Sequence, residues 1–383
     1  GDIPNAEDME KILSYLVEEK LIFSEEKESL LKAFEFIERV QVLFAELQQS
    51  NPKEFSTNLY PGNLTAFLKA YEAKYGRPKW LSAQKEDLWL QEFYKEYYQH
   101  ASGVFEAVGH TIHEYYARMF PPTYSGMKVL KTYRKTDGEE RSIKLQVRHG
   151  LSFRFEHGFT EESKMYLHVE DAEDYFREHP EAMFEVFVLA AKENVLISHR
   201  TRRAMKKIQL ELAMAPKKMQ RETTKALQKS FNGSFLELLK MDSDISYPVW
   251  RMQQFHSLGR YFPYFDILKD YYYADGSRFS LQMQTLRSLE AMEKLFENGQ
   301  TASYQRAASA FREVRKDPSQ IMVLRLAVFL NEIIPIMSKG SFSWESVEKN
   351  VAEVLERLGI DDEKVTQQIS WLVYHQHNLA LNS

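Results

Sequence analysis

Residues 24–47, SEEKESLLKAFEFIERVQVLFAEL, carry apolar side chains at alternating intervals of three and four residues. This spacing places them on one face of an α-helix, because the helix turns by about 100° per residue. Ser24 precedes the apolar residues as the expected N-cap, with Glu25 and Glu26 in the first turn, where the helix dipole favours negative charge. The stretch predicts a long amphipathic helix, whose apolar stripe consists of Leu30, Phe34, Ile37, Val40, Phe44 and Leu47.

Most of the chain shows the same spacing, and only 15 glycines and 12 prolines interrupt it. Further helices are expected at about 83–120, 244–257, 281–298, 317–337, 344–358 and 362–380. One stretch has a period of two instead, since Ile143, Leu145 and Val147 alternate with polar residues. Asp137-Gly138 before it is a hairpin turn signal. The sequence therefore predicts a mostly α, multidomain helical protein with a small β insert at about 126–168.

The length of 383 residues predicts more than one domain, because single cores rarely grow beyond about 250–300 residues. We expect a helical block at 1–122, the β insert within 123–170, a connector of basic helices at 171–279, and a helical module at 280–383.

Composition excludes several classes of function. The net charge of −5 gives no reason to expect general binding to nucleic acid or to an anionic membrane. The absence of cysteine excludes disulfides, iron–sulfur clusters and a thiol nucleophile, and it agrees with a cytoplasmic location. No window matches the roughly 18–20 apolar residues of a membrane span. Gly1 stands where Met is usual, which indicates a tag remnant on a piece of a longer protein.

One stretch, 198–229, is strongly basic, with ten Lys or Arg residues against two Glu. Its net charge of +8 leaves −13 for the rest of the chain. If any surface of the chain recognises a ligand, we expect it to be the densest part of this stretch, which would attract a phosphate group or an acidic protein surface. In the simpler alternative, these side chains contact water or pair with acidic residues of neighbouring helices. The predicted binding residues are Arg200, Arg202, Arg203, Lys206 and Lys207.

Two patterns look catalytic and have simpler interpretations. Gly233-Ser234 followed by Asp242 and Asp244 is similar to the magnesium–nucleotide motif of polymerase-β-type nucleotidyltransferases. That chemistry needs the Asp pair on a strand edge, whereas the intervening residues have helical spacing, so we expect a junction between helices. His110 and His113 share a helix face but have no evident third ligand, so we expect a structural role.

Residues 256–265, HSLGRYFPYF, with Met252 before them, resemble a segment of the bifunctional uridylyltransferase/uridylyl-removing enzymes that modify PII signal proteins, the GlnD type. In that family a Met and a glycine-containing turn lead to Pro and an aromatic residue, just before a His-Asp (HD) phosphohydrolase domain. Other segments resemble the family in the same order along the chain: Phe36–Val40, Phe93-Tyr94, Tyr97–Ala101, Phe176-Arg177, and Pro180 with Met183 and Phe187.

The resemblance implies an HD-like domain at 280–383, carried by Ser280–Arg287, Leu326–Ile333, Val351–Gly359 and Trp371–Gln376. The departures from the family fall on the metal ligands that it implies. Gln284 replaces the first His, Asn331-Glu332 replaces the His-Asp doublet, and Gln376 replaces the last His, unless the register slips by one to His375. Neutral amides suit neither the charge nor the ligand field of a metal that makes hydroxide, so the implied site is lost.

The resemblance thus implies a non-catalytic scaffold or regulatory part of a PII-uridylyltransferase-like protein in nitrogen signalling. We expect no cofactor, although the parent family uses Mg²⁺ and a second divalent metal. The expected partner is a PII-like signal protein or another acidic protein, with no membrane and no nucleic acid. Two alternatives stay open: a divergent metal-dependent phosphohydrolase with a site rebuilt from Glu332, His375 and His377, or a binding module that uses the basic helices of 198–229. Whether the chain is an enzyme is left open.

Overall fold

The structure, a computed structural model, describes residues 6–55, 61–79, 81, 89–119, 123–134, 138–154, 158–255, 257–271, 280–297, 312–338 and 342–381. The chain divides into two compact units. Unit 1 holds residues 1–123, 149–163 and 270–280, and unit 2 holds 124–148, 164–269 and 281–383. The boundaries expected at 122, 170 and 279 stay a prediction.

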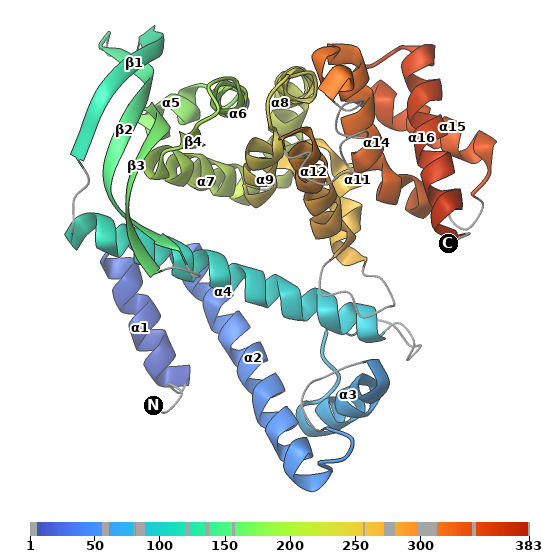
Figure 1. Ribbon diagram of the computed structural model, residues 1–383. Helices are drawn as coiled ribbons and strands as arrows, with labels where there is room; N and C mark the ends of the chain where they lie inside the picture. Colours follow the sequence, from blue (N-terminus) through green and yellow to red (C-terminus); the bar gives the residue numbers. More distant parts are fainter. Residues whose placement is uncertain are drawn as a thin grey trace. The chain divides into compact units, whose positions relative to one another are not determined.

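The described residues of unit 1 include four helices, drawn in blue to cyan in Figure 1: α1 (Ala6–Glu18), α2 (Ser24–Ser50), α3 (Pro61–Tyr75) and α4 (Trp89–Met119). Helix α2 contacts each of the other three. Aromatic side chains form much of the small core between them, since the Phe93 ring lies 6.2 Å from Phe36 and 5.8 Å from Phe67 between centroids. Such aromatic pairs add to the stabilisation that burial alone provides.

The long helix expected from residue 24 is present, but its buried face is rotated from the predicted one. The fully buried side chains are Ala33, Phe36, Val40 and Leu43, so of the predicted stripe only Val40 is among them. Both sets have helical spacing, and the packing of α3 and α4 decides between them. The cap also differs by one residue, because Phe23 is the N-cap and its backbone N–H donates to Glu26 Oε2 at 2.8 Å.

The small sheet lies where the period-two pattern predicts it. Its strands are β1 (Thr123–Arg134), β2 (Glu140–Arg154), β3 (Gly158–Val169) and β4 (Leu196–Ile197), in the order β1-β2-β3-β4. The first hairpin turn includes Gly138, whose φ of +88° suits glycine, whereas Asp137 lies outside the described residues. Strand β4 was not predicted, because two residues are too few to show the alternation of apolar and polar side chains that indicates a strand. It pairs parallel with β3, with Leu167 opposite Ile197.

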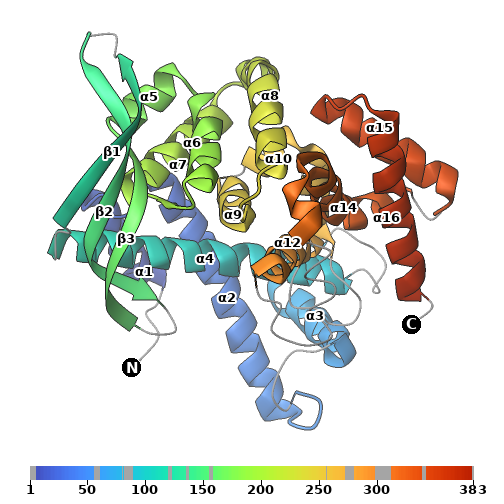
Figure 2. The ribbon, with the colours of Figure 1, turned by 45° about the horizontal axis from the view of Figure 1, so that its top comes forward.

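Helices complete unit 2, and Figures 1 and 2 show α5, α6 and α7 against one face of the sheet. The helices are α5 (Ala172–Glu178), α6 (Ala182–Lys192), α7 (His199–Met214), α8 (Lys217–Leu239), α9 (Ser246–Gln254), α10 (Ser257–Tyr261), α11 (Pro263–Ile267), α12 (Leu281–Glu297), α14 (Pro318–Met337), α15 (Trp344–Leu358) and α16 (Glu363–Leu381). Helices α12, α14, α15 and α16 begin and end within one residue of the expected bounds, whereas α9 is shorter than the helix expected at 244–257. The mostly α fold class is confirmed.

A chain of aromatic contacts runs through unit 2 from α6 to α14. The ring centroid of Phe231 lies 5.6 Å from that of Phe184 and 5.4 Å from that of Phe235. Phe235 in turn lies 5.6 Å from Phe329 of α14. Residues of the predicted connector and of the predicted C-terminal module therefore share one core.

Helix α14 is the buried helix expected at 317–337. Asp317 caps it, and its carboxylate accepts from the backbone N–H of Ser319 at 2.8 Å. By length and composition alone α14 could cross a membrane, which corrects the expectation that no segment is apolar enough. A buried core helix passes the same test, and α14 contacts α12, α15 and α16 on its flanks.

The guanidinium of Arg325 lies at the centre of unit 2, with no exposed surface. Its Nε and Nη2 donate to the two carboxylate oxygens of buried Glu293 at 2.7 and 3.0 Å. The remaining donors reach the end of α8 and the loop after it, at the carbonyls of Met241 (2.7 Å) and Ser243 (2.8 Å). Arg325 thus joins α12, α14 and the C-terminal end of α8.

Replacing Arg325 should be costly, because it leaves the buried Glu293 carboxylate with only the more distant Arg315, whose Nη2 lies 3.8 Å away, and leaves several carbonyls without donors. We expect Arg325→Met to lower the free energy of unfolding by about 3–5 kcal/mol, measured by urea titration at pH 7. The control Lys316→Met removes an exposed ion pair to Glu313, at 2.7 Å, and should change stability by less than about 1 kcal/mol. Equal effects of the two substitutions would contradict the conclusion that Arg325 joins α12, α14 and the C-terminal end of α8.

Candidate functional site

The residues at the implied HD-ligand positions lie on three helices of unit 2. Gln284 lies on α12, Asn331 and Glu332 lie on α14, and Gln376 lies on α16. Helix α14 contacts both α12 and α16, and Figures 1 and 2 show α14 and α16 next to each other. The Asn331 amide donates to Glu332 Oε1 at 3.1 Å, and its Oδ1 atom is buried without a hydrogen-bond partner.

The rebuilt-site alternative needs residues of α16. His375 is exposed, and its ring lies tilted against that of Trp371, at 4.5 Å between centroids. The side chain of His377 lies outside those that the structure describes, so the set with Glu332 is not tested. Among the described residues, no group of three or more His, Cys, Asp or Glu side chains could hold a metal ion.

The nucleotidyltransferase-like pattern lies on a helix and the loop after it, as the helical spacing predicts. Gly233 and Ser234 are inside α8. The Asp244 carboxylate accepts from the backbone N–H of Ser246 at 2.7 Å, which starts α9, and Asp242 Oδ1 lies 3.4 Å from Arg315 Nε. Both carboxylates therefore have local structural partners. His110 and His113 lie in α4, and their side chains are outside the described ones.

The basic helix α7 begins directly after β4 and is tied to the sheet at its first turn. Ser198 is the N-cap, and its hydroxyl accepts from the backbone N–H of Thr201 at 3.3 Å. The Thr201 hydroxyl accepts from the backbone N–H of Val169 in β3 at 2.9 Å. These contacts set which way the following basic residues point.

The five predicted binding residues all lie on α7, and their binding role stays a prediction. Arg200 is exposed, whereas Arg203 and Lys206 are partly buried. Lys207 Nζ lies 2.5 Å from Glu173 Oε2 on α5, which is the pairing that the simpler alternative describes. Arg202 is placed among side chains of β3 and α9.

The surroundings of Arg202 contain a second arginine that the sequence did not single out. Burial, together with the positive charge of Arg251 on α9, lowers the pKa of Arg202 to about 10. The Arg251 guanidinium lies 5.2 Å from the ring centroid of Tyr247. The Tyr247 hydroxyl accepts from the backbone N–H of Ile197 at 3.0 Å, which holds this part of α9 against β4.

His168 lies close by on β3 and was also missed from the sequence. Its Nδ1 atom is 3.0 Å from the Ser198 hydroxyl. Burial lowers the pKa of the imidazole to about 4, the positive charges of Lys144 and Arg200 contribute, and Glu170 opposes them. The imidazole is therefore neutral at pH 7. Its place in an alternating strand, one residue before a buried position, is the only signal in the sequence.

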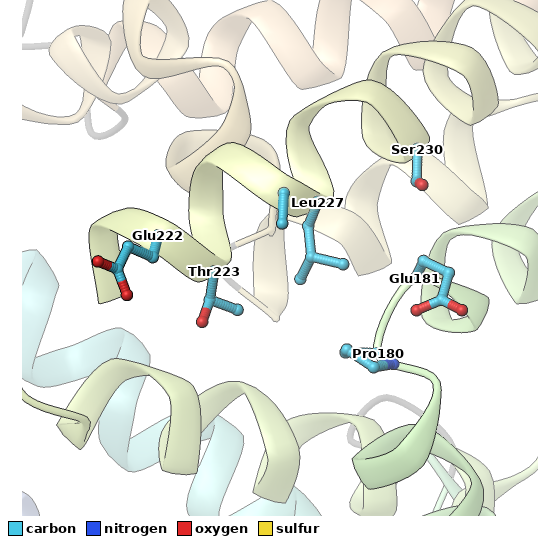
Figure 3. A pocket seen from close by; sticks show the side chains of 7 residues that line it. Pro180, Glu181, Glu222, Thr223, Leu227 and Ser230 are labelled. Carbon is cyan, nitrogen blue, oxygen red and sulfur yellow. The ribbon is translucent and has the colours of Figure 1, made fainter. Parts of the chain in front are cut away.

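An open pocket of about 500 Å³ lies between the α5–α6 connection and α8. Figure 3 shows Glu181 and Glu222 at opposite sides of it, so their carboxylates do not converge. The lining residues are Pro180, Glu181, Glu222, Thr223, Ala226, Leu227 and Ser230. Without converging polar groups, this pocket is not an evident catalytic site.

Comparison with known proteins supports one part of the resemblance. Residues 161–261 match the family model described as uridylyltransferase GlnD third domain. The match covers about a quarter of the chain and runs from β3 to the end of α10, so it includes His168, Arg202 and Arg251. No curated protein and no solved structure matches the chain. A GlnD-like relationship is thus supported, and the HD-like character of 280–383 stays a prediction.

The pKa of His168 makes the stability of the fold sensitive to acid. In the unfolded chain His168 binds a proton as the pH falls below its ordinary pKa of 6.5, whereas in the native state it stays neutral until about pH 4. The free energy of unfolding therefore decreases as the pH falls through this range. At pH 5 the loss should be at most about 2 kcal/mol, since the ring is partly exposed.

Urea titrations at pH 7.5 and pH 5 measure this effect, with His168→Gln as the variant that cannot titrate. Carboxylates elsewhere contribute equally to both proteins, so the difference between them isolates His168. An identical loss of stability in both proteins would show that the imidazole titrates normally.

Proposed function

We propose that this chain is a non-catalytic scaffold or regulatory part of a GlnD-like protein and acts in the cytoplasm. The observation that carries the proposal is the match of residues 161–261 to the GlnD third domain. The continuous core supports a scaffold role, because Phe235 of the matched segment contacts Phe329 and Arg325 binds the carbonyl of Leu239 at 3.1 Å. Residues 281–383 and residues 164–261 of the matched segment are parts of one unit.

The proposal includes the loss of the HD metal ligands. Residues with amide side chains occupy the positions at 284, 331 and 376. Asn331 donates to the carboxylate of Glu332, the acidic residue of the doublet. An HD site makes hydroxide with a metal held by imidazole nitrogens and carboxylates, and amides bind such metals weakly.

The proposed partner is a PII-like signal protein or another acidic protein surface. Helix α8 supports this, because it presents five exposed basic side chains: Lys217, Lys218, Arg221, Lys225 and Lys229. The rest of the chain is net negative, so this helix would orient an acidic partner. Nucleic acid and membrane are not part of the proposal.

A divergent metal-dependent phosphohydrolase is the second candidate. The favouring observation is that Glu332 and His375 lie on the contacting helices α14 and α16. His377 would have to supply a third ligand from the same helix as His375.

A metal measurement separates the two candidates. With any tag removed, the purified chain should carry no stoichiometric iron, manganese or zinc by elemental analysis, and it should not hydrolyse a phosphodiester model substrate. About one metal per chain that Glu332→Ala removes, and the control Glu313→Ala retains, would establish the rebuilt site and overturn the scaffold proposal.

The partner proposal predicts salt-dependent binding to a purified PII signal protein. Reversing charge with Arg221→Glu and Lys225→Glu, which lie one turn apart, should weaken binding roughly tenfold at low salt and less at high salt. The control pair Lys349→Glu and Lys364→Glu makes the same charge change at exposed positions of α15 and α16. Equal effects of the two pairs, or no binding by the parent, would exclude α8 as the interface.

A further inference from the structure

Two arginines lie near the end of β4. Arg202 is one helical turn after Ser198, and Arg251 lies over the ring of Tyr247, whose hydroxyl accepts from the backbone N–H of Ile197. Arg202 comes from α7 and Arg251 from the last turn of α9. The Nε atoms of both are buried and have no hydrogen-bond partner in the described part of the chain. Among the described residues, neither guanidinium forms an ion pair, and the charged or ionisable groups that act on Arg202 are Arg251, Tyr166 and Tyr247.

This arrangement is unfavourable in the free protein. Two like charges repel each other in a partly desolvated place, and each buried N–H without an acceptor costs further free energy. The neighbouring contacts nevertheless hold the arginines there. Arg251 is fixed over the Tyr247 ring and donates from Nη1 to the side chain of Gln254, while the Tyr247 hydroxyl is bound by the Ile197 backbone. Such a fixed, unbalanced positive pair is the arrangement that an oxyanion would complete.

We propose that Arg202 and Arg251 form a binding site for a phosphoryl group. A guanidinium presents its N–H donors in a planar fork, and two forks match the several oxygens of a phosphate better than the two oxygens of one carboxylate. Tyr166 of β3 and Tyr247 of α9 supply neighbouring aromatic side chains. The site differs from the exposed cations of α8 and goes beyond the proposed scaffold role, on which it does not depend.

The experiment uses the full chain with inorganic phosphate and pyrophosphate as probes. Acetate serves as the carboxylate control, and all three are compared at matched ionic strength. Calorimetric titration measures affinity, and urea titration measures stabilisation. With a dissociation constant near 1 mM, about 10 mM phosphate should raise the folding equilibrium constant roughly tenfold.

The variants Arg202→Gln and Arg251→Gln should each weaken phosphate binding at least about tenfold, since each removes a charged donor. Arg202→Lys should also lose affinity, because an ammonium group cannot replace the fork. The control Arg221→Gln makes the same charge change at an exposed position of α8 and should leave binding unchanged.

Stability without phosphate gives an independent test. If the two arginines repel, Arg202→Gln should be at least as stable as the parent in phosphate-free buffer. The proposal is overturned if the parent does not respond to phosphate or pyrophosphate, if Arg202→Gln responds equally, or if acetate gives the same response. Destabilisation of Arg202→Gln with no phosphate response in the parent would instead assign the arginine a structural role.

Discussion

The buried guanidinium of Arg325 is the interaction on which the arrangement of unit 2 depends. A buried charge is tolerated only when its donors are satisfied, and here Glu293 and the carbonyls after α8 satisfy them. This requirement fixes the loop through Met241 and Ser243. Three residues later α9 begins, and α9 carries Tyr247 and Arg251. Side chains of the C-terminal helices therefore help to position the start of α9, the helix of the matched segment that carries Arg251.

Much of the fold could be predicted from local patterns. Helices α12, α14, α15 and α16 begin and end within one residue of the expected bounds, because their apolar spacing and turn residues agree. The period-two stretch likewise predicted the sheet. Features that depend on tertiary packing could not be predicted from such local patterns. Helix α2 has two overlapping apolar stripes, and only its neighbours select the one with Phe36 and Leu43. Strand β4 exists because β3 offers an edge to pair with, not because of its own two residues.

The candidate site shows the same limit more strongly. The cluster of basic residues along the sequence suggested which residues bind a ligand, but the contacts of each side chain depend on which elements pack around the helix. Lys207 consequently reaches Glu173, whereas Arg202 reaches Arg251, forty-nine positions further along the chain. No period or spacing connects those two arginines. The positions implied as HD ligands were evident only from the family resemblance, and the proposed loss of those ligands depends on chemistry that the fold alone does not supply.

The long sequence separation of the Arg325 contacts has a consequence for synthesis on the ribosome. The carbonyl of Met241 is translated 84 residues before the guanidinium that binds it. Until Arg325 leaves the exit tunnel, the end of α8 has a set of acceptors that only water can satisfy, and Phe235 lacks its contact with Phe329. The GlnD-like segment would thus be synthesised first and would lack its contacts with α14, so it would open more easily. It would reach its final stability only after α14 has been translated.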